Sequence, residues 1–177
     1  MSRLRTPVSS QDHLLGSPDA PIILVEFGDY QCPFCGAAHH EVKRLLKTLG
    51  DKLGYVFRHF PLSQVHPYAL QAAEAAEATG AQGQFWKMHN MLFEHQDALE
   101  LASLVSYAEA LNLDLDQFTR DLQEHRFLDR IRRDFMDGVR SGVNGTPTFF
   151  INGVRHNGAY TFDALLAAIE GGATASY

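Results

Sequence analysis

The chain has few of the residues on which several classes of protein depend. Only two of its 177 residues are cysteines, Cys32 and Cys35, and one pair cannot hold a domain of this size together as a disulfide scaffold does. No apolar run approaches the roughly 20 residues of a membrane-spanning helix. The N-terminus, up to His13, has no apolar segment typical of a signal peptide. We therefore expect a cytoplasmic protein that does not bind membranes, while an exported protein without its leader would show the same pattern.

Positive charge is also scarce. The 15 lysines and arginines are outnumbered by 21 aspartates and glutamates, which gives a formal net charge of −6. Because proteins that bind nucleic acids present basic surfaces, no nucleic acid partner is expected. Hydrophobic residues make up 45% of the chain, which is enough for the core of one globular domain of this length.

Apolar runs and helix breakers predict a strand, a helix and a second strand near the N-terminus. Residues 22–27 are a nearly continuous apolar run that ends at Gly28, which is typical of a strand buried on both faces. Residues 33–49 have the pattern of a helix that ends at Gly50, and residues 54–60 have that of a strand. The order strand, helix, strand favours a parallel βαβ unit.

The middle of the chain changes character and is rich in Ala, Leu, Gln and Glu at helical spacing. We predict five helices there, at residues 67–79, 84–93, 101–111, 115–124 and 127–141. Glycines and Pro147 end this block, and strands at residues 148–151 and 154–156 follow, joined by a hairpin turn at Asn152-Gly153. Thr161 caps a last predicted helix at residues 162–170, and residues 171–177 are expected to be a frayed tail.

The two cysteines lie where the first helix begins. Because proline is favoured at the first helical position, Pro33 places Cys32 at the N-cap and Cys35 in the first turn. Two sulfurs so placed lie on one face and within reach of a disulfide bond. Free backbone N–H groups and the positive end of the helix dipole favour a thiolate at the cap. Cys32 is therefore the expected nucleophile, with a lowered pKa, and Cys35 is the expected resolving thiol, nearer the core.

This arrangement resembles the thioredoxin superfamily and, within it, the DsbA-like thiol:disulfide oxidoreductases. Two segments carry the resemblance, residues 25–35 and 142–153, with the sequences VEFGDYQCPFC and GVNGTPTFFING. The helical block between them matches in position and length. The resemblance implies thiols or disulfides of proteins or small molecules as substrates and a separate redox partner that recycles the cysteines. It implies no cofactor, since electrons travel in the thiols.

The resemblance also implies an α/β fold with a defined division of the chain. Residues 1–177 would form a single thioredoxin-like domain. Its core would consist of residues 14–65 and 142–171, and residues 66–141 would be an all-helical insertion.

The resemblance further implies roles for residues outside the cysteine pair. Thr146-Pro147 is expected to be a cis peptide that faces the cysteines, with the Thr146 backbone pairing with an extended substrate. Glu26, six positions before Cys32, matches a buried acid of this superfamily and lies on an apolar face of its strand. Burial would raise its pKa and allow it to exchange a proton with Cys35.

Pro33 and Phe34, which separate the cysteines, are the expected tuning positions. Phe34 departs from the family pattern, because strongly oxidising relatives carry a histidine there whose positive charge stabilises the thiolate of Cys32. Without that charge the disulfide is expected to be a weaker oxidant, so the chain could act as a reductase, an isomerase or a mild oxidase. The sequence leaves the direction of electron flow open.

The expected function is therefore thiol–disulfide exchange through a mixed disulfide at Cys32 that Cys35 resolves. Two other functions stay open, a redox-sensing thioredoxin-like binding module and a glutathione-linked isomerase or transferase on the same fold. A metal site could combine Cys35 with His39, one helical turn later, and His40. No second cysteine pair accompanies them, and both histidines are expected at the helix surface, so no metal is expected.

Three other residues near the predicted site have no assigned role. His66 lies where the second strand meets the helical block and could overhang the cysteines, but a loop histidine before a helix-starting proline is the favoured interpretation. Asp29 and Tyr30 precede the cysteine pair and could tune Cys32. An exposed loop between strand and helix explains both equally well.

Overall fold

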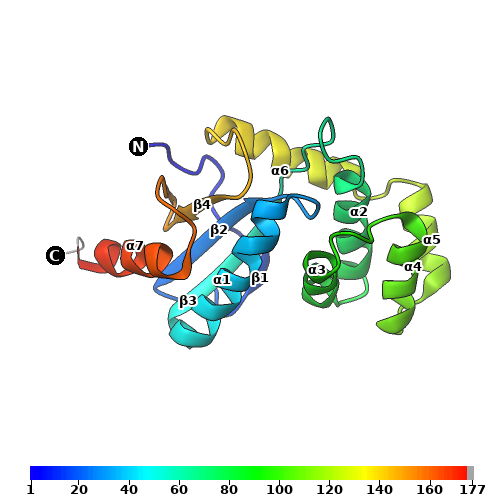
Figure 1. The fold of residues 1–177 in the computed structure, drawn as a ribbon, viewed down its shortest axis with the longest axis horizontal. Coiled ribbons are helices and arrows are strands. Elements are labelled where there is room, and N and C mark those ends of the chain that lie inside the picture. Colours follow the sequence, from blue (N-terminus) through cyan, green and yellow to red (C-terminus); the bar gives the residue numbers. More distant parts are fainter. Residues whose placement is uncertain (175–177) are drawn as a thin grey trace.

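The apolar run that ends at Gly28 forms the central strand of a mixed five-stranded sheet (Figure 1). In the computed structural model, which describes residues 1–174, this strand, β2 (Ile22–Gly28), pairs in parallel with β3 (Leu53–His59). Helix α1 (Pro33–Leu49) and the short 3₁₀ helix η1 (Gly50–Lys52) connect them. The predicted βαβ unit is confirmed.

The remaining strands complete the sheet in the order β1-β3-β2-β4-β5. Strand β4 (Thr148–Ile151) runs antiparallel to β2, and β5 (Val154–Arg155) returns from it through the predicted hairpin. Strand β1 (His13–Leu15), which pairs antiparallel with β3, was not predicted. Three residues are too few to show a periodic pattern, so this strand depends on its pairing with β3.

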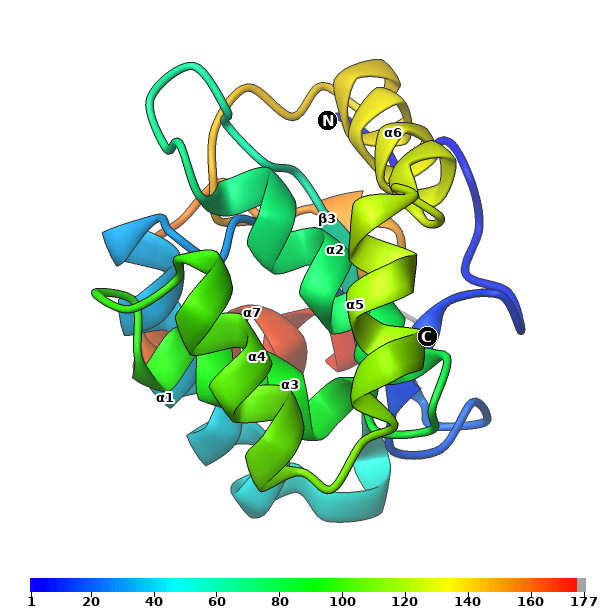
Figure 2. The same ribbon diagram turned by 90° about the vertical axis from the view of Figure 1, so that its right-hand side faces the viewer.

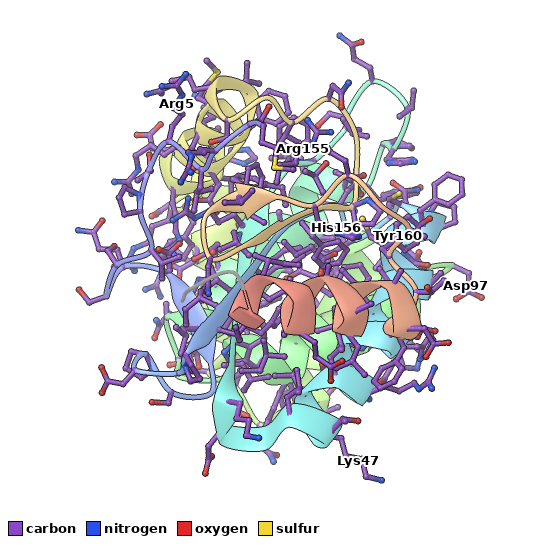
Figure 3. The ribbon with its side chains drawn as sticks, turned by 90° about the vertical axis from the view of Figure 1, so that its left-hand side faces the viewer. Arg5, Lys47, Asp97, Arg155, His156 and Tyr160 are labelled. Carbon is purple, nitrogen blue, oxygen red and sulfur yellow. The ribbon has the colours of Figure 1, made fainter. Side chains whose placement is uncertain are left out.

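The register of the strands assigns the side chains to two apolar layers. Glu26 is aligned with Phe57 on one side and with Phe149 on the other, on the face that packs against α1 and α7 (Phe162–Thr174). The opposite face, with Val25 and Phe150, packs against the N-terminal segment and α6 (Leu128–Arg140). Figure 3 shows α7 crossing the front of the molecule below the β4–β5 hairpin.

Four helices of the insertion form a bundle beside α1 (Figure 2), and its buried side chains share one core with those of α1 and the sheet. They are α2 (Ala69–Gly80), α3 (Phe85–Glu94), α4 (Leu101–Ala110) and α5 (Leu115–Gln123). Alanines of α2 are fully buried at its centre, because their small side chains let the neighbouring helices approach closely. Helix α6 belongs to residues 66–141 in sequence but packs on β3, and the ring of Phe135 stacks at 4.3 Å on that of Phe60, the residue after this strand.

Most predicted helix boundaries lie within one residue of those observed. Helix α2 begins at Ala69, two residues later than predicted, because the preceding loop is bonded to the segment before the cysteines. Helix α7 continues to Thr174 instead of ending at residue 170, so the prediction of a frayed tail is wrong for residues 171–174. Residues 175–177 lie outside the described part of the chain. Within residues 1–174, no helix has the length and apolar character needed to cross a membrane.

Candidate active site

Cys32 and Cys35 lie where α1 begins, as the sequence predicts. Cys32 is the N-cap with an extended backbone, and Pro33 opens the helix. Both cysteines are free thiols and both are buried, with exposed fractions of 3% for Cys32 and 0% for Cys35. Pro33 and Phe34, between them, are exposed, and the Phe34 side chain is 61% exposed.

The two thiols differ sharply in acidity. A hydrogen bond from the Cys35 thiol, helped by the backbone N–H groups of Phe34 and Cys35, lowers the pKa of Cys32 to about 5 against the opposing effect of burial. Burial raises the pKa of Cys35 well above its ordinary value, and the hydrogen bond to Cys32 and the charge of Glu26 act in the same direction. The first sulfur is therefore suited to be a thiolate and the second a thiol.

Glu26 lies on the sheet face that α1 covers and is 1% exposed. The Tyr55 hydroxyl donates a hydrogen bond of 2.5 Å to its Oε2, and its Oε1 is buried without a partner among the described residues. Burial raises the pKa of Glu26 to about 8, even though the bond from Tyr55 lowers it. Near neutral pH this carboxyl group therefore holds a proton that it can give up or regain.

The segment before β4 faces the cysteines from the other side. The peptide bond between Thr146 and Pro147 is cis. The Thr146 carbonyl oxygen lies 3.5 Å from Cys32 Sγ, and the Thr148 hydroxyl donates to the Gly145 carbonyl at 2.7 Å, which holds the turn. The Thr146 side chain is a further cause of the lowered pKa of Cys32.

Asp29 and Tyr30 are buried, so their interpretation as an exposed loop is wrong. Each is 1% exposed, because the insertion covers the turn between β2 and α1. Tyr30 Oη lies 2.9 Å from His89 Nδ1 on α3, and Asp29 Oδ2 lies 2.8 Å from His66 Nδ1. The contact with His66 joins residues 37 positions apart, which no local pattern could reveal.

A family model described as Thioredoxin matches residues 8–171. The chain belongs to the thioredoxin family. Among solved structures, α-DsbA1 from Wolbachia pipientis is 26% identical with a TM-score of 0.81, covering 95% of this chain and 93% of that one. A thioredoxin-like oxidoreductase from Silicibacter pomeroyi is also 26% identical, with a TM-score of 0.83 and 94% of each chain covered. BdbD from Bacillus subtilis, at 22% identity and a TM-score of 0.83, shares the fold over 96% of this chain and 97% of its own.

These likenesses confirm the thioredoxin-like α/β fold and the resemblance to DsbA-type oxidoreductases. They support thiol–disulfide exchange as the general chemistry of this thioredoxin-family chain.

Curated relatives are more similar in sequence but much longer. The Na⁺/H⁺ antiporter NhaA 1 of Salinispora arenicola is 50% identical over 167 residues, which are 94% of this chain and 26% of that protein. The Na⁺/H⁺ antiporter NhaA of Herminiimonas arsenicoxydans is 39% identical over 168 residues, which are 94% of this chain and 27% of that protein. The chain thus spans about a quarter of the length of these relatives.

The sequence predicts that both histidines after Cys35 lie at the helix surface, and the structure shows that this is wrong for one of them. His40 is exposed, but His39 is only 4% exposed, and its ring stacks on Phe93 of α3 at 5.1 Å. The insertion covers this side of α1, and burial lowers the pKa of His39 to about 4. Within residues 1–174, no group of three or more His, Cys, Asp or Glu side chains could hold a metal ion.

Proposed function

We propose that the protein exchanges disulfides with cysteine-containing polypeptides through a mixed disulfide at Cys32. The observation that carries this proposal is that the pKa values of the two thiols shift in opposite directions: that of Cys32 is lowered to about 5, and that of Cys35 is raised. At neutral pH Cys32 is therefore a thiolate that can act as the nucleophile, and Cys35 stays protonated as a thiol.

In the reducing direction, the Cys32 thiolate attacks one sulfur of a substrate disulfide. A bond forms between Cys32 and that sulfur, and the other substrate sulfur leaves with the electron pair as a thiolate. Cys35 then loses its proton and attacks Cys32, which releases the remaining substrate sulfur as a thiolate. The substrate disulfide is reduced to two thiols and the enzyme is oxidised to the Cys32–Cys35 disulfide. In the oxidising direction the same bonds form and break in reverse order.

We propose that Glu26 accepts the proton of Cys35 and later returns it. The pKa of this carboxyl, about 8, lies closer to neutrality than that of an ordinary glutamate, and its Oε1 is free of protein partners within the described structure. A general acid or base works best when its pKa is near the working pH. In its ionised form, a minority near pH 7, Glu26 can take the proton when Cys35 attacks, and in its protonated form it can return the proton when the disulfide is reduced.

The surface around Cys32 favours a polypeptide over a small thiol. Phe34 is 61% exposed, and Tyr68, whose backbone N–H is bonded to Gln31 next to Cys32, is 42% exposed. Such aromatic surface suits the apolar side chains that an unfolded chain presents. Opposite them, the backbone at Thr146 offers hydrogen bonds to an extended segment, as the family resemblance implies.

The name of the curated relatives adds no activity to this proposal. The match covers 26% of the Salinispora protein, and transport by the whole protein says nothing about the chemistry of the matched quarter. A redox-sensing binding module is the second candidate, because the site would also allow a disulfide to form without turnover.

A peptide with one cysteine, activated as a disulfide with thionitrobenzoate, tests the proposal. The Cys35→Ala variant should release one equivalent of coloured thiolate and accumulate a one-to-one covalent complex at Cys32. The wild-type protein should release free peptide, because Cys35 resolves the complex. The Cys32→Ala variant is the control and should trap nothing, since Cys35 is fully buried and its raised pKa keeps it a thiol. A binding module would retain the peptide without any covalent complex in the Cys35→Ala variant, and that outcome would refute the proposed enzyme.

A further inference from the structure

The Asp29 side chain is fully buried at the start of α1 and accepts four N–H hydrogen bonds. Its Oδ1 accepts from the backbone N–H groups of Gln31, at 2.7 Å, and Cys32, at 3.2 Å. Its Oδ2 accepts from the backbone N–H of Leu62 and lies the same 2.8 Å from His66 Nδ1. One carboxylate therefore fixes the backbone of the nucleophile and the loop between β3 and α2.

Three of these four partners are neutral amides, and His66 alone among them can carry charge. Its side chain is 20% exposed, so it can exchange protons with solvent. When His66 is protonated, it and Asp29 form a neutral pair. When His66 is neutral, a negative charge on Asp29, which accepts a hydrogen bond from the Cys32 amide at 3.2 Å, has no positive partner among these four groups and raises the energy of the Cys32 thiolate.

We propose that His66 and Asp29 are positioning residues that set the acidity of Cys32, with His66 supplying the positive charge that Phe34, between the cysteines, does not. His66 acts on the thiol through the Asp29 carboxylate, which bonds both the imidazole and the Cys32 amide. The inference rests on the proposed function of Cys32 as nucleophile and adds a second loop to the site.

Four other ionisable side chains of the site are acids, so none of them can supply a positive charge. Cys35 on α1 and Glu26 on β2 are buried, and their raised pKa values keep them neutral near pH 7 or below. Tyr30, next to Asp29, also has its pKa raised by burial. Tyr160, in the loop before α7 (Figure 3), has its pKa raised by burial and then by the charges of the cysteines. His66, bonded to Asp29, is the basic side chain in this set.

The test compares two glutamine variants that each remove an imidazole from a buried carboxylate. His66→Gln keeps a neutral hydrogen-bond donor but loses the charge. His125→Gln is the matched control, because His125 Nδ1 bonds Glu74 Oε1 at 2.7 Å in the insertion and contacts no residue of the site. Alkylation of reduced protein by iodoacetamide, located by mass spectrometry, reports the thiolate of Cys32 from pH 4 to 8.

We expect the His66→Gln variant to be alkylated roughly twofold to fivefold more slowly at pH 5, with its midpoint moved up by about 0.5 to 1 pH unit. The His125→Gln variant should keep the wild-type midpoint. The equilibrium with glutathione should shift in parallel, toward the oxidised protein in His66→Gln. An unchanged midpoint in His66→Gln, even with a lower melting temperature, would overturn the proposal and leave the pair a structural clamp.

A double-mutant cycle with Asp29→Asn tests whether His66 acts through Asp29. If it does, His66→Gln should change the midpoint much less in the Asp29→Asn background than in the wild type. Equal effects in both backgrounds would contradict the route through Asp29. If Asp29→Asn does not fold, the single variants still decide the proposal. Alkylation needs no substrate disulfide, so this inference and the proposed exchange activity can fail independently.

Discussion

Replacing Glu26 with glutamine should make the protein more stable at alkaline pH. Folding raises the pKa of this carboxyl from its ordinary 4.5 to about 8. Between these two values the unfolded chain gives up a proton that the folded chain keeps. The free energy of unfolding therefore falls by about 1.4 kcal/mol for each pH unit in that window.

The sign and size of the effect follow from these two pKa values. Below pH 4.5 both states are protonated and Glu26 adds no pH dependence; above about pH 8 both states are ionised and the loss is complete. The full loss is about 4 to 5 kcal/mol, a large share of the 5 to 15 kcal/mol that stabilise a typical domain. Glutamine is neutral throughout and occupies nearly the same volume, so the variant escapes this loss.

The assay is urea unfolding of the reduced protein from pH 4 to 9, with a phosphine reductant to keep both thiols free. The difference in unfolding free energy between Glu26→Gln and wild type should grow with pH by several kcal/mol and level off above pH 8. Glu109→Gln, on the exposed face of α4, is the control and should give a flat difference. A flat difference for Glu26→Gln as well would refute the assignment of a buried, protonated Glu26.

Three further predictions concern the thiols and the junction between the core and the insertion. The alkylation rate of wild-type Cys32 should have its midpoint near pH 5. Because this acidity lies between those of thioredoxin and DsbA, the reduction potential measured by equilibration with glutathione should be roughly −180 mV. Phe34→His should lower the Cys32 midpoint and make the disulfide more oxidising in the same assay; an unchanged potential would show that this position does not tune the site. Glu77→Gln should destabilise the protein by roughly 3 to 5 kcal/mol at pH 7, because it leaves a buried cluster with His13 and His59 without its anion. Since that cluster holds the pKa of Glu77 well below 4.5, wild-type stability should fall as the pH drops through 4.5, and the variant should lose this part of the acid dependence.

The parts of the site that the sequence predicts are those with local signals. Pro33 marks the helix start and so places both cysteines, and the alternation of β2 places Glu26 on the face that α1 covers. The burial of His39 could not be predicted, because it depends on where the insertion lies against α1, which is a tertiary matter. The contact of Asp29 with His66 was missed for the same reason. A polar residue next to a cysteine pair and a histidine at a strand's end are each unremarkable until the fold joins them.

The two acids near the cysteines show how one chain can give the same carboxyl group opposite tasks. Glu26 receives a single hydrogen bond, from Tyr55, in an apolar layer, so burial dominates and its pKa rises to about 8. Asp29 is buried as completely but accepts four N–H hydrogen bonds, an arrangement that stabilises a carboxylate. The first is therefore suited to carry a proton to and from Cys35, and the second ties His66 to the backbone of Cys32.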